Sequence, residues 1–293
     1  MFVSQLPLLS DLPSFSPGGT LALGPHLADH GPEVVYREMP CKTIIGRSDA
    51  ARRAGMPFSW TINPYRGCEI GCGYCYARYT HHYLGRTDPD AFEREIFVKV
   101  GAEARVAKDL RASHFAGEEI AIGTATDPYQ PAERRYRLTR RILEKLAAFS
   151  GLTLSITTKS PIILDDVELL ARIGRRSHLT VHVSLVSLDA DMVRRLEPKG
   201  ATPERRLETI RGLASAGIRV GLFRMPVIPG INDGEADLAR LDRAARAAGA
   251  TFVCTQRMSL RKAAWPAFSD MLARHFPEAL PAFARRAEHL TRA

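Results

Sequence analysis

From Phe58 onward, hydrophobic residues recur along the chain with two different spacings. Short runs are apolar or alternate apolar with polar residues, which is typical of strands, and longer runs repeat every third or fourth position, which is typical of helices. The short runs predict six strands, over residues 60–62, 119–126, 152–158, 179–187, 219–227 and 251–258. The longer runs predict helices over residues 89–115, 132–149, 164–175, 190–196, 203–216, 235–248, 261–275 and 277–292. Because parallel strands need crossover helices, this order predicts an α/β protein built as an open, partial (β/α)6 TIM-type barrel.

The same pattern divides the chain into three parts. Residues 1–55 are rich in Pro and Gly and lack sustained periodicity, so we expect an irregular lead-in with one short element near residues 34–36. Residues 56–260 hold the predicted barrel, and residues 261–293 are expected to form a C-terminal helical extension packed on it. A chain of 293 residues, 45% of them hydrophobic, can bury a core of this size.

Two of the predicted strands carry one polar face. The polar positions are Thr153, Ser155, Thr157, Thr180, His182 and Ser184. If the apolar faces pack on helices, these side chains line the inside of the barrel. A polar interior indicates a bound ligand, and a hydrated interior with satisfied hydroxyl groups is the alternative.

A cysteine-rich loop follows the first predicted strand directly. Cys68, Cys72 and Cys75 have the spacing Cys-x3-Cys-x2-Cys, and three glycines among them let the backbone wrap closely around a compact group. A structural zinc ion needs four ligands, and His81 and His82 are the nearest candidates for the fourth. Three thiolates can instead hold three irons of a [4Fe-4S] cluster and leave the fourth iron open, whereas a ferredoxin-type cluster normally has four thiolates. In a barrel of this type, such a loop lies at the face where active sites are built.

The cysteine spacing resembles that of the radical S-adenosylmethionine (radical SAM) superfamily, in which an aromatic residue commonly precedes the third cysteine, as Tyr74 does here. Three longer runs resemble a bacterial branch of that superfamily related to spore photoproduct lyase. They are residues 56–78 (MPFSWTINPYRGCEIGCGYCYAR), 126–131 (TDPYQP) and 226–233 (PVIPGIND). The resemblance covers about residues 40–275, so it does not depend on one short motif.

This resemblance implies an enzyme with two cofactors. Cys68, Cys72 and Cys75 would hold a [4Fe-4S] cluster whose open iron binds S-adenosylmethionine. An electron from a reductant such as flavodoxin or ferredoxin would then split S-adenosylmethionine. The resulting 5′-deoxyadenosyl radical would act on a substrate that the sequence does not identify.

The resemblance also implies cofactor contacts at the ends of the predicted strands. The candidate residues are Tyr74, Thr126, Asp127, Lys159, Ser184, Arg224 and Val227. Tyr74 resembles the residue whose backbone meets the adenine, and Val227 with Ile228 resembles an apolar contact to the same ring.

The polar candidates correspond to the other parts of S-adenosylmethionine. Thr126 and Asp127 occupy the place where the superfamily contacts the methionine amino group, and Ser184 the place where it meets the ribose or carboxylate. Lys159 and Arg224 are expected to partner a carboxylate. Asp127 is equally open to a structural interpretation, as the cap of the helix that follows it.

Composition adds two expectations. A net charge of +9 and a pI near 9.6 permit a nucleic-acid partner, although arginines in amphipathic stretches usually form solvated helix faces. No apolar run approaches the length of about 18 residues that spans a membrane, and residues 1–19 make a poor signal peptide, so we expect a cytoplasmic protein without a membrane partner. Cys41 and Cys254 are interpreted as structural thiols, with a ligand or redox role for Cys41 and a hydrogen-atom donor or auxiliary-metal role for Cys254 as alternatives.

Two other functions compete with a radical SAM enzyme of unassigned substrate. One is a DNA photolesion lyase similar to spore photoproduct lyase. That lyase uses a further cysteine about forty residues past its cluster loop, and this chain has no cysteine between Cys75 and Cys254. The other is a non-catalytic, zinc-stabilised module that binds nucleic acid.

Overall fold

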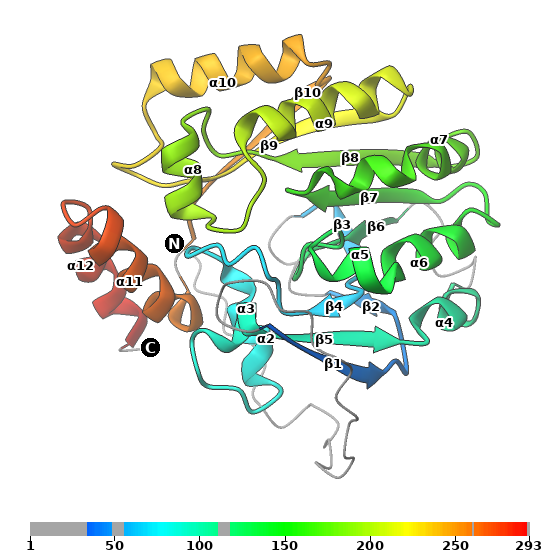
Figure 1. Ribbon diagram of the computed structural model, residues 1–293, viewed down its shortest axis with the longest axis horizontal. Coiled ribbons are helices and arrows are strands. Elements are labelled where there is room, and N and C mark those ends of the chain that lie inside the picture. The colour runs from blue at the N-terminus through cyan, green and yellow to red at the C-terminus, as the bar shows by residue number, and fades with distance from the viewer. Residues whose placement is uncertain (1–33, 49–55, 111–117, 260, 292–293) are drawn as a thin grey trace.

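The computed structural model describes residues 34–48, 56–110, 118–259 and 261–291 (Figure 1). Within them the main sheet holds six parallel strands that pair in the order of the chain. They are β3 (Phe58–Ile62), β6 (Glu119–Ile122), β7 (Thr153–Thr158), β8 (His178–Ser184), β9 (Arg219–Val227) and β10 (Phe252–Arg257). β2 (Ile45–Arg47) pairs antiparallel with β3 at one edge. The predicted partial (β/α)6 barrel is therefore confirmed.

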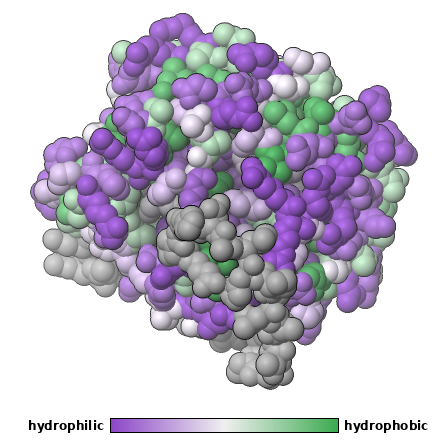
Figure 2. Space-filling model, viewed as in Figure 1, coloured by the Kyte–Doolittle hydropathy of each residue, from purple (hydrophilic) through white to green (hydrophobic). Residues whose placement is uncertain are grey.

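Helices cover the outer face of this sheet (Figure 1). They are α5 (Ala132–Tyr136), α6 (Leu138–Leu146), the 3-10 helix η4 (Pro161–Asp166), α7 (Val167–Gly174), α9 (Pro203–Ser215) and α10 (Glu235–Ala247). α8 (Ala190–Leu196) lies at the loop end of the strands (Figure 1). Apolar strand residues such as Leu154, Ile156, Val181 and Val183 are buried. The outer surface of the helices is mostly hydrophilic, as Figure 2 shows for one face of the molecule.

The helix predicted over residues 89–115 is wrong. The described part of this segment is α3 (Ala91–Arg94), β5 (Glu95–Val100) and α4 (Ala102–Asp109), and residues 111–117 lie outside the described residues. β5 pairs in parallel with β1 (Val35–Pro40) and antiparallel with β4 (Tyr65–Arg66), which makes a second, smaller sheet. The sequence Ile-Phe-Val-Lys-Val fits strand alternation as well as a helical period, and pairing with β1 decides between them.

The helix predicted over residues 132–149 is interrupted. Arg137 has φ of 48° and separates α5 from α6. The Glu133 carboxylate accepts hydrogen bonds from the backbone N–H groups of Thr139 at 3.0 Å and Arg140 at 3.1 Å. Glu133 therefore stabilises the start of the second helix, as an acidic group does at a helix N-terminus.

The C-terminal helices lie beside the loop end of the barrel (Figure 1). They are η5 (Lys262–Ala264), α11 (Trp265–His275) and α12 (Leu280–Thr291), and α11 contacts α8. The division into lead-in, barrel and extension stays a prediction. Among the described residues no helix is both long and apolar enough to cross a membrane, and the cytoplasmic location stays a prediction.

Candidate functional site

The cysteine loop, residues 67–75, leaves the end of the first barrel strand and carries three free thiols. Cys68 and Cys72 are buried and Cys75 is partly exposed. Burial raises the pKa of all three thiols, and the charges of Cys72 and Cys75 raise the pKa of Cys68 further, so the three sulfur atoms lie close enough to interact. Because a metal takes thiolates, loading this site would release protons.

The backbone of the cysteine loop is held from several sides. Gly67 has φ of 87°, and a Cβ there would lie 2.8 Å from the carbonyl oxygens of Phe92 and Glu95, so only glycine fits. The N–H of Cys68 donates to Phe92 O at 2.9 Å. The N–H of Gly73 donates to Leu196 O at 3.1 Å, which ties the loop to the end of α8.

Gly73 also permits close packing by the C-terminal extension. A Cβ on Gly73 would meet Met271 of α11 at 2.8 Å. Behind the loop, the buried Arg78 of η2 (Tyr76–Arg78) donates to Cys72 O at 3.1 Å and pairs with Glu93 at 2.6 Å. The thiols therefore sit on a rigid support.

Two of the runs that resemble the radical SAM branch, residues 56–78 and 126–131, meet at this loop. Asn63 accepts a hydrogen bond from the N–H of Ala125 at 2.8 Å, which joins the ends of β3 and β6. Gln130 donates to Gly67 O at 3.1 Å and accepts from the N–H of Glu69 at 3.0 Å. These motif residues therefore position the cysteines.

Thr126 and Asp127 lie at the end of β6, beside the cysteine loop. The Thr126 hydroxyl donates to Gly67 O at 2.6 Å. Asp127 is buried and accepts from the Thr158 hydroxyl at 2.7 Å, from Lys159 N at 2.7 Å and from Tyr129 N at 2.9 Å. Burial raises the pKa of Asp127, although these donors oppose the shift. Protein donors thus occupy both oxygens of this carboxylate, and it joins the end of β6 to the end of β7.

Lys159 and Ser184 belong to a buried charged cluster that reaches the cysteine loop. Lys159 Nζ donates to Ser184 Oγ at 2.6 Å and lies 3.1 Å from Glu197 Oε1. Glu197 is fully buried and also accepts from the Tyr74 hydroxyl and from the guanidinium of Arg206. Burial alone would raise the pKa of Glu197, and the two cations lower it to about 2.

Two members of this cluster, Glu197 and Arg206, were missed by the sequence analysis. Arg206 is fully buried, and its guanidinium also donates to Ser184 O at 2.9 Å. It lies four residues before Ile210 and seven before Leu213, hence on the apolar face of α9. A charged residue on the apolar face of a predicted helix was the sequence feature that could have indicated a buried ion pair.

The structure does not bring Arg224 to this cluster. Its guanidinium faces α10, where it lies 2.8 Å from Asp242 Oδ1 and donates to Leu238 O at 3.2 Å. Val227 is buried at the end of β9, and its carbonyl accepts from Met258 N at 2.9 Å. The sequence pattern placed both residues on the correct strand, but it did not show which side Arg224 faces.

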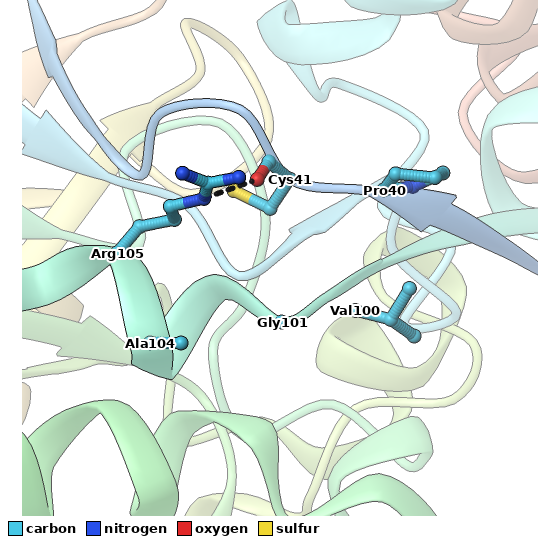
Figure 3. A pocket seen from close by; sticks show the side chains of 6 residues that line it. All are labelled: Pro40, Cys41, Val100, Gly101, Ala104 and Arg105. Carbon is cyan, nitrogen blue, oxygen red and sulfur yellow. Dashed lines mark hydrogen bonds between the residues drawn. The ribbon is translucent and has the colours of Figure 1, made fainter.

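The remaining histidine and cysteine candidates lie apart from the loop thiols. His81 Nε2 bonds with Glu95 O at 2.9 Å, and its ring packs against Phe92 and Phe97. Cys41 lines a hollow of about 420 Å³ between β1 and α4, where Arg105 donates to its carbonyl at 3.1 Å (Figure 3). Cys254 lies on β10 beside Phe223 of β9.

The residues present fit an iron–sulfur cluster better than a single metal ion. In the part of the chain that the structure describes, no three His, Cys, Asp or Glu side chains are grouped as one metal ion requires. His81, the expected fourth zinc ligand, is engaged elsewhere. Three neighbouring thiols on one loop, with no fourth described, match a cluster that keeps one iron open.

Comparison with known proteins identifies the family. A family model described as the radical SAM superfamily matches residues 62–241, which include the cysteine loop and the whole of the four barrel strands β6, β7, β8 and β9. The chain belongs to the radical SAM superfamily. Radical SAM proteins use a [4Fe-4S] cluster and S-adenosylmethionine, and these are the cofactors of this chain.

Two uncharacterized proteins from different organisms are similar to this chain. An uncharacterized protein of Mycobacterium tuberculosis is 37% identical over 245 residues, which cover 84% of this chain and 71% of that protein. An uncharacterized protein of Methanocaldococcus jannaschii is 28% identical over 180 residues, covering 60% of this chain and 63% of that protein.

Among solved structures, spore photoproduct lyase has a similar fold. A mutant of that lyase with bound dinucleoside spore photoproduct superimposes with a TM-score of 0.60 at 18% sequence identity. The match covers 82% of this chain and 66% of the lyase. A second mutant, with bound AdoMet and the same dinucleoside, gives a TM-score of 0.60 at 17% identity.

Proposed function

We propose that this radical SAM protein cleaves S-adenosylmethionine reductively and uses the product to abstract a hydrogen atom from an organic substrate. In this proposal Cys68, Cys72 and Cys75 hold the cluster. The observation that carries the proposal is the juxtaposition of three thiols, two of them buried and one partly exposed, with the Lys159 ammonium group at one edge of the barrel.

When bound together, the two cofactors supply a 5′-deoxyadenosyl radical, which reacts with carbon centres that no protein side chain can activate. The residues of the chain bind and orient these cofactors and exclude water. Burial of most of the cysteine loop supports the last role, since a site closed to water limits side reactions.

Lys159 is our candidate for the carboxylate of S-adenosylmethionine. Glu197 carries one negative charge, and two cations, Lys159 and Arg206, contact it. One positive charge is thus left over, and it belongs to the cation that is less buried, Lys159. Because Ser184 Oγ accepts from Lys159, the hydroxyl proton of Ser184 is available to the same carboxylate or to the ribose.

The other candidates receive two kinds of role. We propose that the backbone of Tyr74 and the apolar end of β9 at Val227 contact the adenine. We assign Thr126 and Asp127 to positioning, because their hydrogen bonds hold the cysteine loop and Lys159 rather than facing an open space. Arg224 is not retained as a cofactor residue, because Asp242 and Thr255 already pair with it.

The substrate is not set by the family, and the choice among reactions rests on this chain. A DNA photolesion lyase is a less favoured candidate than another substrate-modifying reaction, since no cysteine lies between Cys75 and Cys254. A zinc-stabilised binding module is disfavoured because His81 is already bonded to a backbone carbonyl. A flavodoxin or ferredoxin is expected as the electron donor.

The test is cofactor binding and cleavage by anaerobically reconstituted protein. We expect reduced wild-type protein to form methionine and 5′-deoxyadenosine, and Lys159→Gln to weaken S-adenosylmethionine binding about tenfold or more, as loss of a charge-assisted hydrogen bond does. Lys145→Gln, an exposed lysine of α6, is the matched control and should bind normally. Equal affinity in both variants would remove Lys159 from the cofactor site.

A further inference from the structure

A chain of contacts runs from the cysteine loop to Lys159 through the side chain of Tyr74. Tyr74 is buried and lies between Cys72 and Cys75 in the sequence. Its hydroxyl donates to Glu197 Oε1, and the same oxygen lies 3.1 Å from Lys159 Nζ. The Lys159 ammonium group also lies 5.7 Å from the centroid of the Tyr74 ring. Tyr74 is thus linked to Lys159 through a shared carboxylate oxygen and through its ring.

Arg206, the other cation that pairs with Glu197, is fully engaged by the protein. Its Nε donates to Ala201 O at 2.9 Å, one terminal nitrogen donates to Ser184 O at 2.9 Å, and the other donates to Glu197 Oε2. The side chain of Arg206 has no exposed surface. Arg206 is therefore a fixed support for Glu197 and does not reach a ligand.

Lys159 differs from Arg206 because it keeps a donor for a ligand. An ammonium group has three N–H donors. Two of them meet Ser184 Oγ at 2.6 Å and Glu197 Oε1 at 3.1 Å, and the third has no partner among the described residues. The Lys159 side chain also keeps 15% of its surface exposed. The third donor can therefore bind a carboxylate without breaking either contact.

A carboxylate on this third donor would share the ammonium group with Glu197, so two anions would lie close together. Like charges repel, and the repulsion is strong in a site shielded from water. The Tyr74 hydroxyl donates to Glu197 Oε1, which is the oxygen on the side of Lys159, and so offsets part of its negative charge. Arg206 does the same at Oε2. Tyr74 thus lowers the repulsion that a second carboxylate meets at Lys159.

We propose that the Tyr74 side chain is a positioning residue for S-adenosylmethionine, because its hydroxyl holds Glu197 so that Lys159 can bind the carboxylate of the cofactor. This inference deepens the proposed function and rests on the assignment of Lys159. It gives the phenol group a role separate from the proposed contact between the Tyr74 backbone and the adenine. Because Tyr74 lies between two of the cluster ligands, the same side chain sets the position of Lys159 relative to the cysteine loop.

Tyr65 of β4 offers the matched control. It is buried, and its hydroxyl also donates to a buried carboxylate, that of Glu133. Glu133 accepts further hydrogen bonds from the backbone N–H groups of Thr139 at 3.0 Å and Arg140 at 3.1 Å. Tyr65→Phe therefore removes the same kind of hydrogen bond as Tyr74→Phe, at a carboxylate held by the start of α6 instead of by a cofactor lysine.

The first test measures S-adenosylmethionine binding by equilibrium dialysis with cluster-loaded, unreduced protein. Tyr74→Phe keeps the ring beside Lys159 and removes only the hydroxyl. We expect it to bind about three- to tenfold more weakly than the wild type, as loss of one hydrogen bond to a charged group does. Tyr65→Phe should bind normally. The affinity is referred to the iron and sulfide content, so partial loading does not enter it. Equal affinity in Tyr74→Phe and the wild type would overturn the inference.

The second test asks whether Tyr74 acts through Lys159. In a double-mutant cycle, Tyr74→Phe should weaken S-adenosylmethionine binding in the wild-type background and have no further effect in Lys159→Gln. Two independent contributions would instead add. Additive losses would therefore exclude a positioning role that runs through Lys159.

The third test changes the ligand instead of the protein. Decarboxylated S-adenosylmethionine brings no second anion to Glu197, so Tyr74→Phe should bind it as tightly as the wild type does. A loss as large as the loss for S-adenosylmethionine would show that the hydroxyl acts only on packing, and the inference would be wrong.

These failures are distinct from failure of the proposed function. If Lys159→Gln binds S-adenosylmethionine normally, the assignment of Lys159 fails and this inference fails with it. If Lys159→Gln weakens binding and Tyr74→Phe does not, only the role of Tyr74 is wrong.

Discussion

Two flanks of the barrel, one at the cysteine loop and one on the inner face of β8–β10, differ in how fully their polar groups are hydrogen-bonded. Around the cysteine loop, the side chains of Asn63, Thr126 and Asp127 form hydrogen bonds with the backbone or with neighbouring side chains. Glu197 forms ion pairs with two cations. On the inner face of β8–β10, His182 has one long contact, to the Thr157 hydroxyl at 3.5 Å, and the rings of His182, Phe223 and Phe252 stay partly exposed. The first flank is held in one geometry by its hydrogen bonds and ion pairs, whereas the second keeps part of its ring surface uncovered.

The largest expected effect is a loss of folding stability on substitution of Glu197. In Glu197→Gln, Arg206 and Lys159 keep their charges without the carboxylate, and removing one member of a buried ion pair costs about 3–5 kcal/mol. Denaturant unfolding would measure this loss. Glu208→Gln, in an exposed pair with Arg205, is the control and should change the free energy of unfolding by less than about 1 kcal/mol. Similar losses in the two variants would contradict a rigid cofactor flank.

The half-buried imidazole of His182 should make stability depend on pH. The pKa of His182 is about 4 in the folded chain and 6.5 ordinarily, so between these values only the unfolded chain takes up the proton. The free energy of unfolding should therefore fall as pH drops from 7 to 4.5, by about 2 to 3 kcal/mol from this residue. His182→Gln should lose that part of the pH dependence, and His275→Gln, at an exposed position, should keep it. A pH profile unchanged by His182→Gln would contradict the lowered pKa of His182 in the folded chain.

Substitution of Asp127 distinguishes a residue that positions the loops from one that contacts S-adenosylmethionine. Asp127→Asn turns one acceptor oxygen into a donor that faces Thr158 or the N–H of Lys159, and an unsatisfied buried group costs about 1–3 kcal/mol. We expect lower stability with unchanged S-adenosylmethionine affinity in the folded, loaded protein. Asp165→Asn, at an exposed side chain, is the stability control. A selective loss of S-adenosylmethionine affinity would instead return Asp127 to the cofactor residues.

The smallest effect is expected at Arg224. Its pair with Asp242 is partly exposed, and such pairs contribute about 1 kcal/mol or less. Arg224→Gln should therefore bind S-adenosylmethionine with wild-type affinity and unfold at nearly the same denaturant concentration. Weaker cofactor binding in this variant would mean that the guanidinium turns from α10 toward the barrel in the loaded protein.

The barrel could be predicted from the sequence because the hydrophobic residues of each strand and of most helices follow either a strand spacing or a helix spacing, but not both. It failed between residues 89 and 115, where Ile96 and Val98 fit two spacings and pairing with β1 decides. The cysteines and Lys159 could be placed at one edge from strand order alone. Side-chain direction could not: Arg224 differs from Phe223 by one position and faces the opposite side of the sheet. Glu197 was missed because a charge in the segment between two helices looks solvated until its partners are known.

The most direct measurement of the central claim is low-temperature electron paramagnetic resonance of anaerobically reconstituted, reduced protein, with and without S-adenosylmethionine. A cluster held by Cys68, Cys72 and Cys75 with one open iron predicts a [4Fe-4S]+ signal that shifts when S-adenosylmethionine is added. The signal should be lost in Cys68→Ala and kept in Cys41→Ala. Stoichiometric zinc without a cluster, or a cluster signal that S-adenosylmethionine leaves unchanged, would contradict the account.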